Sequence, residues 1–191
     1  MRFFILLSVT FFAGSIPFSY LVGKILFNLD IRDFGNDNNP GPANSFRANG
    51  LKLGVPSLVL DYLKGVMPLY LIITRNELHF FPFVVISIAP ILGHIFTPFL
   101  KFKGGKGITT TFGVWSALTL WEVPTFLGGT FVIFALLKRI YGKKINDRMI
   151  VVISSALLVF FVAIRFADIR FTTIAILNAI LLIFGQYRGT L

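Results

Sequence analysis

The chain has 191 residues, of which 55% are hydrophobic and only 14% are charged, with 23 Phe and no Cys. A soluble domain carries about 25% charged residues, so the composition excludes an ordinary soluble protein and predicts a polytopic membrane protein. The lack of Cys excludes disulfides, thiolate metal sites and Cys nucleophiles, and His79 and His94 alone are too few ligands to predict a zinc centre. We therefore expect no metal and no organic cofactor.

The net charge of +10 would suit a nucleic-acid partner. The basic residues, however, fall in short loops between apolar segments, as is typical of loops held on the cytoplasmic side of a membrane. We therefore expect contact with membrane lipids and no nucleic-acid partner.

Seven apolar segments follow one another, and crossing a bilayer takes about 20 residues of helix. The pattern predicts a single all-α domain over 1–191, a membrane bundle of about seven transmembrane helices. The first segment imitates a signal peptide but continues to Phe27 without a small-residue cleavage site, which indicates a retained span. Segments 108–120 and 123–137 are short and could instead be one element broken around Pro124. The segments are 3–27, 51–74, 80–100, 108–120, 123–137, 149–166 and 171–187.

Charge then predicts the orientation of the bundle. Seven crossings place 13 of the 18 basic residues on one side and four on the other, with Lys64 inside a span. The side richer in Lys and Arg is normally cytoplasmic. We therefore expect the N-terminus outside, the C-terminus in the cytoplasm, and the polar segments 28–50 and 101–107 together on the cytoplasmic face.

The first polar segment, "DIRDFGNDNNPGPANSFRANG" (30–50), is dense in Asn, Gly and Pro. Short amide groups such as Asn39 and Asn44 suit turns and hydrogen-bond ligand oxygens, and Gly41 permits a tight bend. Arg47 can hold a phosphate through two parallel hydrogen bonds. The alternative interpretation is an ordinary polar linker.

Further along, Asp61 and Lys64 in "LDYLKG" (60–65) are three residues apart and share one helical face. Ionisable groups inside a span are usually paired and face the interior. We favour an internal ion pair that positions its span near the site over a direct role in ligand binding.

His94 lies in "LGHIFTPFLKFKGGKG" (92–107), inside an apolar segment. One interpretation is a packed, hydrogen-bonded structural residue. The other is a general base or a donor to a substrate oxygen, because the ordinary pKa of His suits proton transfer near neutrality.

Lys106 is surrounded by Gly104, Gly105 and Gly107 just before an apolar segment. Glycines let main-chain amides approach an anion, and a helix that starts at Ile108 would point its positive end at the same place. The segment predicts a phosphate site, although a basic loop in this position could instead contact anionic lipid head groups.

Together these segments resemble the bacterial acyl-phosphate:glycerol-3-phosphate acyltransferases, the PlsY family. The resemblance is carried by four motifs in order: "GSIPFSYLVGK" (14–24), "DIRDFGNDNNPGPANSFR" (30–47), "LDYLKG" (60–65) and "GHIFTPFLKFKGGKG" (93–107). It implies a bacterial inner-membrane protein with a cytoplasmic active site. It also implies transfer of a fatty acyl chain from acyl phosphate to the 1-hydroxyl of glycerol 3-phosphate, which gives lysophosphatidic acid.

The chain departs from this family in three places, one of them the His motif, where the proline that normally follows His by three is displaced to Pro98, with Thr97 in its place. Its first polar loop is one residue longer, with Asp37 in an unfamiliar position and no Ser after Gly35. The family's H-R-x-N-I segment after the last span is replaced by "GQYRGTL". Either another group makes that contribution or activity is weakened or lost.

Three functions follow from these observations. In the first, Lys106 with its neighbouring glycine amides binds one phosphate, and Arg47 with Asn39 and Asn44 binds the other. The attacking hydroxyl then loses its proton to His94 or, as we slightly favour, to the substrate's own phosphate. The second function is a non-catalytic relative that binds anionic phospholipid or its precursors. The third, a small transporter of a phosphorylated solute, ranks last because the sequence shows no internal repeat.

Overall fold

The computed structural model describes residues 1–188, and every regular element among them is a helix. This confirms the all-α prediction. The α-helices are α1 (Arg2–Ser15), α2 (Phe18–Phe27), α3 (Pro42–Arg75), α4 (Phe80–Ile95), α5 (Ile108–Thr119), α6 (Glu122–Tyr141), α7 (Asp147–Phe166) and α8 (Ile169–Tyr187). Short 3-10 helices are η1 (Ile31–Phe34), η2 (Pro98–Leu100) and η3 (Gly142–Lys144).

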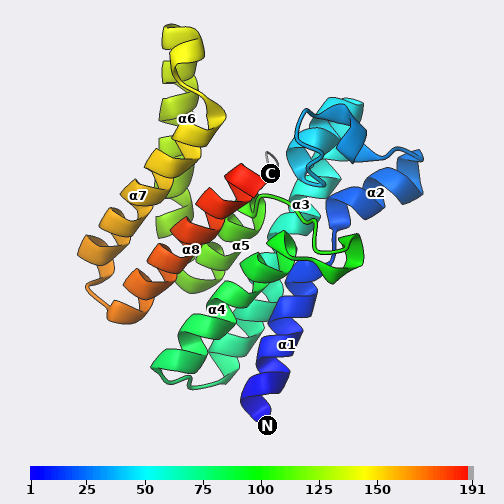
Figure 1. The fold of residues 1–191 in the computed structure, drawn as a ribbon. Coiled ribbons are helices and arrows are strands. Elements are labelled where there is room, and N and C mark those ends of the chain that lie inside the picture. The colour runs from blue at the N-terminus through cyan, green and yellow to red at the C-terminus, as the bar shows by residue number, and fades with distance from the viewer. Residues whose placement is uncertain (189–191) are drawn as a thin grey trace.

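The helices form two groups that share a core (Figure 1). Helices α1, α3 and α4 pack together, α7 packs between α6 and α8, and a contact between α4 and α8 joins the groups. Helix α5 packs against both α3 and α6. The N-terminus and the C-terminal end of α8 lie at opposite ends of the bundle (Figure 1).

Two glycines set the distance between α3 and α5. A Cβ on Gly65 would lie 2.7 Å from the carbonyl oxygen of Thr110, and a Cβ on Gly113 would collide with the carbonyl oxygen of Tyr62. Small residues allow this close approach of helix backbones in membranes, where packing replaces the hydrophobic effect as the driving force between helices. The first turn of α5 is thereby held against the middle of α3.

A break near the start of α3 folds its first turns over the rest of the helix. Asn49 and Gly50 have non-helical angles, with a φ of +52° at Gly50, and glycine adopts that conformation without steric cost. The ring of Phe46 lies against Gly54, where any Cβ would collide with it. The break lets Phe46, next to Arg47, pack against a later turn of the same helix.

The first apolar segment, 3–27, which was predicted to be one retained span, consists of two helices with a bend between them. Helix α1 ends at Ser15, α2 begins at Phe18, and the two are bent by 44°. Pro17 lies at the break, and proline disrupts a helix because it lacks an amide hydrogen and clashes with the preceding turn.

The predicted ion pair of Asp61 and Lys64 is present, and it closes this break. The two side chains are buried and their charged atoms are 2.7 Å apart. The Lys64 ammonium also donates to the carbonyl of Ile16 at 2.7 Å, and the Ser19 hydroxyl donates to the Asp61 carboxylate. The pair therefore satisfies main-chain and side-chain groups on both sides of the bend, which would otherwise be costly in an apolar setting.

Fewer than seven of the described helices are long and apolar enough to cross a membrane by themselves. Five described stretches are long and apolar enough to cross a membrane, and the bent pair of α1 and α2 makes a sixth. The five are Pro42–Arg75, Phe80–Leu100, Glu122–Tyr141, Asp147–Phe166 and Ile169–Tyr187. Helix α5 has only 12 residues, about 18 Å of helix against a hydrocarbon core of about 30 Å. Seven full crossings are therefore not confirmed.

The close crossing of α3 and α5 gives a stability prediction. Gly113→Ala places a methyl group against the carbonyl of Tyr62 and should destabilise the protein by about 1–3 kcal/mol, the usual cost of overpacking. The thermal midpoint of the purified protein in detergent should fall.

Gly129→Ala is the matched control, because a Cβ on Gly129 of α6 meets no atom within 4 Å among the described residues. An equal fall in the midpoint for both variants would contradict the proposed importance of the crossing.

Candidate functional site

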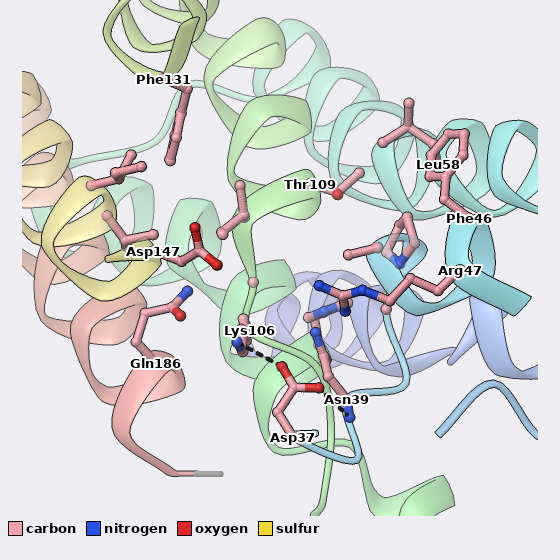
Figure 2. Close-up of a pocket in the computed structure, with 18 of the residues that line it drawn as sticks. Asp37, Asn39, Phe46, Arg47, Leu58, Lys106, Thr109, Phe131, Asp147 and Gln186 are labelled. Carbon is pink, nitrogen blue, oxygen red and sulfur yellow. Dashed lines mark hydrogen bonds and ion pairs between the residues drawn. The ribbon is translucent and has the colours of Figure 1, made fainter. Parts of the chain in front are cut away.

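The site is a cavity of about 530 Å³ where several helix ends meet (Figure 2). The starts of α3, α5 and α7, the loop that contains Asp37 and the end of α8 all contribute to its wall. Its polar lining residues are Asp37, Asn39, Arg47, His94, Lys106, Thr109, Asp147 and Gln186. Its apolar lining side chains include Phe46, Leu58, Phe131, Ala135, Ile150 and Val151.

Lys106 and Arg47, which come from the two separate polar segments, both line this cavity. Figure 2 shows the Lys106 ammonium joined to Asp37, with Asn39 and the Arg47 guanidinium on the other side of Asp37. The structure therefore brings together the two cations that the sequence singled out.

Lys106 forms an ion pair with Asp37, at 2.7 Å between the ammonium nitrogen and one carboxylate oxygen. Both side chains are about a quarter exposed, at 26% and 27%. Burial acts to raise the pKa of Asp37, but the hydrogen bond and charge of Lys106, with smaller help from Asn39 and Asn44, outweigh it and lower the pKa below its usual range. Asp37 is therefore ionised at neutral pH.

Asn44 connects the same loop to Arg47. It is fully buried, and its amide oxygen accepts from Arg47 at 2.5 Å while its amide nitrogen donates to the Asn39 carbonyl at 2.8 Å. The same nitrogen makes a longer contact of 3.4 Å with Asp37. A Cβ on Gly35 would overlap the Asn44 amide, so that glycine leaves room for it.

Asn44 thus differs from its predicted role as a phosphate ligand, because protein groups use both ends of its amide and it does not line the cavity. Asn39 and Gly41, by contrast, do line it. Asn44 instead connects the loop that carries Asn39 to Arg47.

In the glycine-rich segment, too, only some of the predicted phosphate ligands line the cavity. The amides of Gly104 and Gly105 donate to the carbonyls of Ile95 and His94, at 3.1 and 3.2 Å. These two amides, which were predicted to hold phosphate, instead fasten the segment to the end of α4. Gly107 lines the cavity as the N-cap of α5, with a φ of +86°.

Two helix starts present main-chain amides to the cavity. The first main-chain hydrogen bond of α5 runs from Thr111 to Gly107, so the amides of Ile108, Thr109 and Thr110 have no partner within the helix. Pro42 and Ala43 begin α3 at the same cavity. Proline has no amide hydrogen, and the amides of Asn44 and Ser45 donate to the carbonyl of Gly41, so the first turn of α3 offers the amide of Ala43. Helix starts carry partial positive charge and bind anions, which adds to the charges of Arg47 and Lys106.

His94 lies at the back of the cavity and is only 6% exposed. Its ring packs against Gly105, where a Cβ would collide with the ring nitrogen Nε2. This packing agrees with a structural role and leaves an edge of the residue at the cavity. Asp61 and Lys64 do not line the cavity; their contacts are with each other and with Ile16 and Ser19 at the break between α1 and α2.

Sequence reasoning missed Gln186, which is buried and lines the cavity beside Lys106 (Figure 2). It belongs to "GQYRGTL", where only His and Asn were sought; residues 189–191 of that segment lie outside the described chain. Gly185 explains its placement, because a Cβ there would lie 2.8 Å from the carbonyl oxygen of Lys106. Arg188 secures the end of α8 by donating to the carbonyls of Ile95 and Phe102.

Comparison with known proteins gives consistent matches. A family model described as glycerol-3-phosphate acyltransferase matches residues 4–190. Glycerol-3-phosphate acyltransferase 1 of Thermotoga maritima is 42% identical over 143 residues, which are 74% of this chain and 70% of that protein. The glycerol-3-phosphate acyltransferase of Fusobacterium nucleatum is 43% identical over 114 residues, 60% of this chain and 58% of that protein.

A solved structure has the same fold. It is PlsY (YgiH), an integral membrane glycerol 3-phosphate acyltransferase, in its glycerol 3-phosphate form. The TM-score is 0.81 at 25% identity, and the match covers 100% of this chain and 90% of that one. The same protein in its lysophosphatidic acid form also matches with a TM-score of 0.81.

The ion pair of Lys106 and Asp37 gives a prediction about pH. A carboxyl whose pKa is lowered by folding contributes stability above its unfolded pKa, and that contribution is lost as the pH falls through the folded value. The ordinary pKa of Asp is 3.8. The difference in thermal midpoint between the wild type and Asp37→Asn should therefore stay constant from about pH 8 to pH 5 and shrink below about pH 4.

Scanning calorimetry or fluorescence in detergent can measure this difference. A difference that already disappears between about pH 7 and pH 5 would contradict the lowered pKa.

Proposed function

Since the chain belongs to the glycerol-3-phosphate acyltransferase family, we propose that it transfers a fatty acyl group from an acyl phosphate to the 1-hydroxyl of glycerol 3-phosphate. The product is lysophosphatidic acid. The observation that carries this proposal is the meeting of Arg47 and Lys106, from two distant polar segments, at one cavity with two helix starts.

Both reactants carry a phosphate group, and the cavity offers two cationic positions for them. At the first, Arg47 uses one guanidinium nitrogen on Asn44, so its other N–H groups can hold a phosphate together with Asn39 and the start of α3. At the second, Lys106 and the open amides at the start of α5 hold the other phosphate. Each position combines a full charge with oriented main-chain dipoles.

The remaining wall of the cavity suits a fatty acyl chain. Phe131 and Ala135 of α6 face Ile150 and Val151 of α7 there, and Leu58 lies on α3. In a bilayer these helices are surrounded by lipid tails, so a chain that leaves the cavity between them stays in apolar surroundings. The acyl phosphate can then place its head group at the cations and its tail in the membrane.

The chemistry is direct transfer without an acyl-enzyme. Acyl phosphate is already activated, and the lining residues hold no Ser or Cys nucleophile beside a base. The site contributes by placing the two reactants in attack geometry, which can supply about 7–11 kcal/mol of the barrier. Its cations and amides also stabilise the charge that develops on the carbonyl oxygen and the leaving phosphate. The leaving phosphate is the final proton acceptor, and the packing of His94 against Gly105 favours it over that imidazole.

We place this reaction at the cytoplasmic face of a bacterial inner membrane. The carbonyl oxygen of Phe102, in the loop that leads to Lys106, accepts a hydrogen bond from Arg188 at the end of α8. The cavity and the end of α8 therefore lie at the same end of the bundle. Lys101, Lys103, Lys138 and Arg139 lie in the short polar stretches that the charge distribution assigns to the cytoplasm.

The purified protein with acyl phosphate and glycerol 3-phosphate gives the direct test. We expect release of inorganic phosphate that depends on glycerol 3-phosphate, formation of lysophosphatidic acid, and no product with acyl-CoA as the donor. Turnover with acyl-CoA alone would overturn the proposed donor. No turnover with either donor, despite binding of glycerol 3-phosphate, would favour a non-catalytic relative.

The two cations should be essential. Replacing Lys106 or Arg47 with Ala removes a charged donor to a phosphate, and each change should lower kcat/KM at least about 100-fold, as removal of one such donor does elsewhere. Initial rates of phosphate release measure the effect.

Lys101→Ala and Arg75→Ala are matched controls, since Lys101 is an exposed residue before the same glycines and Arg75 lies at the far end of α3. The kcat/KM of each control should stay within about threefold of the wild-type value, a much smaller change than the loss expected for Lys106→Ala or Arg47→Ala. Full activity in Lys106→Ala and Arg47→Ala would refute the assignment.

A further inference from the structure

Asp37 is a carboxylate in a cavity that otherwise suits anions. One of its oxygens pairs with Lys106 at 2.7 Å, and the other accepts from the main-chain amide of Asn39 at 3.3 Å. The carboxylate lines the cavity and its side chain is 27% exposed, so a bound molecule can reach it. Neither of the two proposed phosphate positions uses this carboxylate.

A negative charge in this position is a cost for phosphate binding. Two like charges a few ångströms apart repel one another strongly in a partly buried site. The ion pair with Lys106 offsets part of that cost. Toward the bound molecule itself, the carboxylate can act favourably only as a hydrogen-bond acceptor, because an ionised carboxylate has no donor. The identity of its partner therefore follows from which reactant offers a donor.

Only one of the two reactants does so. An ionised acyl phosphate has oxygen acceptors and no N–H or O–H group, whereas glycerol 3-phosphate has two hydroxyls. We therefore propose, on the basis of the function proposed above, that Asp37 accepts hydrogen bonds from the glycerol hydroxyls and takes the proton of the attacking 1-hydroxyl.

The fixed relation between Asp37 and Arg47 supports this assignment. The Asn44 amide bonds to Arg47 through its oxygen and contacts Asp37 through its nitrogen, so a single amide group separates the cation from the carboxylate. Glycerol 3-phosphate has the matching pattern, with an anion at one end and hydroxyl donors along a short chain. Arg47 would take its phosphate while Asp37 takes its hydroxyls, which leaves Lys106 for the acyl phosphate.

The proton transfer balances without any further reactant. The oxygen of the 1-hydroxyl forms a bond to the carbonyl carbon of the acyl phosphate as its proton moves to a carboxylate oxygen of Asp37. The bond between the carbonyl carbon and the phosphate oxygen then breaks, and its electron pair leaves with the phosphate. Asp37 gives the proton to that phosphate, so hydrogen phosphate and lysophosphatidic acid are released and the carboxylate is restored. Ion pairing with Lys106 weakens Asp37 as a base, but it also keeps the carboxylate deprotonated between turnovers.

The test is Asp37→Asn in the full-length protein, assayed with acyl phosphate and glycerol 3-phosphate. Asn has the same shape and still accepts a hydrogen bond, but it cannot take a proton. We expect kcat to fall at least about 100-fold, the lower range for loss of a general base. The KM for glycerol 3-phosphate should stay the same or fall, because a repulsive charge is gone.

Asp33→Asn is the matched control. It removes the same charge from the same polar segment, but Asp33 is exposed and does not line the cavity, so its kcat should equal that of the wild type. If Asp37→Asn keeps its kcat and only the KM falls, Asp37 is merely a counter-ion of Lys106 and the proposal is overturned.

A binding measurement separates this proposal from the proposed function. Calorimetry compares glycerol 3-phosphate with propyl phosphate, which has the phosphate but no hydroxyl. The wild type should prefer glycerol 3-phosphate about tenfold or more, as expected for hydrogen bonds to a charged acceptor, and Asp37→Ala should lose that preference. An unchanged preference in Asp37→Ala overturns the role of Asp37. A wild type that keeps the preference without turnover overturns only the acyl transfer.

Discussion

The close contact of α3 and α5 at Gly65 and Gly113 is the constraint on which the site depends. It holds the start of α5 against the middle of α3, and the hydroxyl of Thr110 donates to the carbonyl of Asp61 beside it. The break at Gly50 then brings Arg47 back toward the same place. The two helix starts and the two cations therefore come together because Gly65 and Gly113 let the backbones of α3 and α5 pack closely, where larger side chains would separate them.

The cavity balances its charges locally. Asp37 neutralises Lys106, and Asn44 leaves most of the guanidinium of Arg47 available. Farther inside, the buried pair of Asp61 and Lys64 is satisfied by groups on both sides of the bend between α1 and α2. A membrane interior tolerates such charges only when they are paired. Here the pair also holds the bend between α1 and α2, because it bonds to Ile16 and Ser19 on its two sides.

Much of this arrangement could be predicted from the sequence. Long apolar segments gave the helical fold, because in a membrane the main chain must satisfy its own hydrogen bonds. The density of Gly, Asn and basic residues in two segments identified Arg47 and Lys106, and the spacing of Asp61 and Lys64 identified an ion pair. These signals are local, so they can be recognised along the chain.

The features that escaped prediction depend on tertiary contacts. Gly104 and Gly105 looked like phosphate ligands, but the end of α4 supplies carbonyls that use their amides. Asn44 was assigned to the ligand, although its amide lies between Arg47 and Asn39. The position of Gln186 depends equally on neighbours that are distant in sequence, so local composition gave no sign of it, whereas the shortness of α5 was already visible in segment 108–120.

The position of α8 has a consequence for biosynthesis. Gly185 lies against the main chain of Lys106, Gln186 lines the cavity, and Arg188 donates to carbonyls that precede the glycine-rich segment. Chains emerge from the ribosome in order and fold progressively. A nascent protein that has inserted only α1 to α7 therefore still lacks the part of the cavity wall that α8 supplies, and the cavity is completed only when the eighth helix docks.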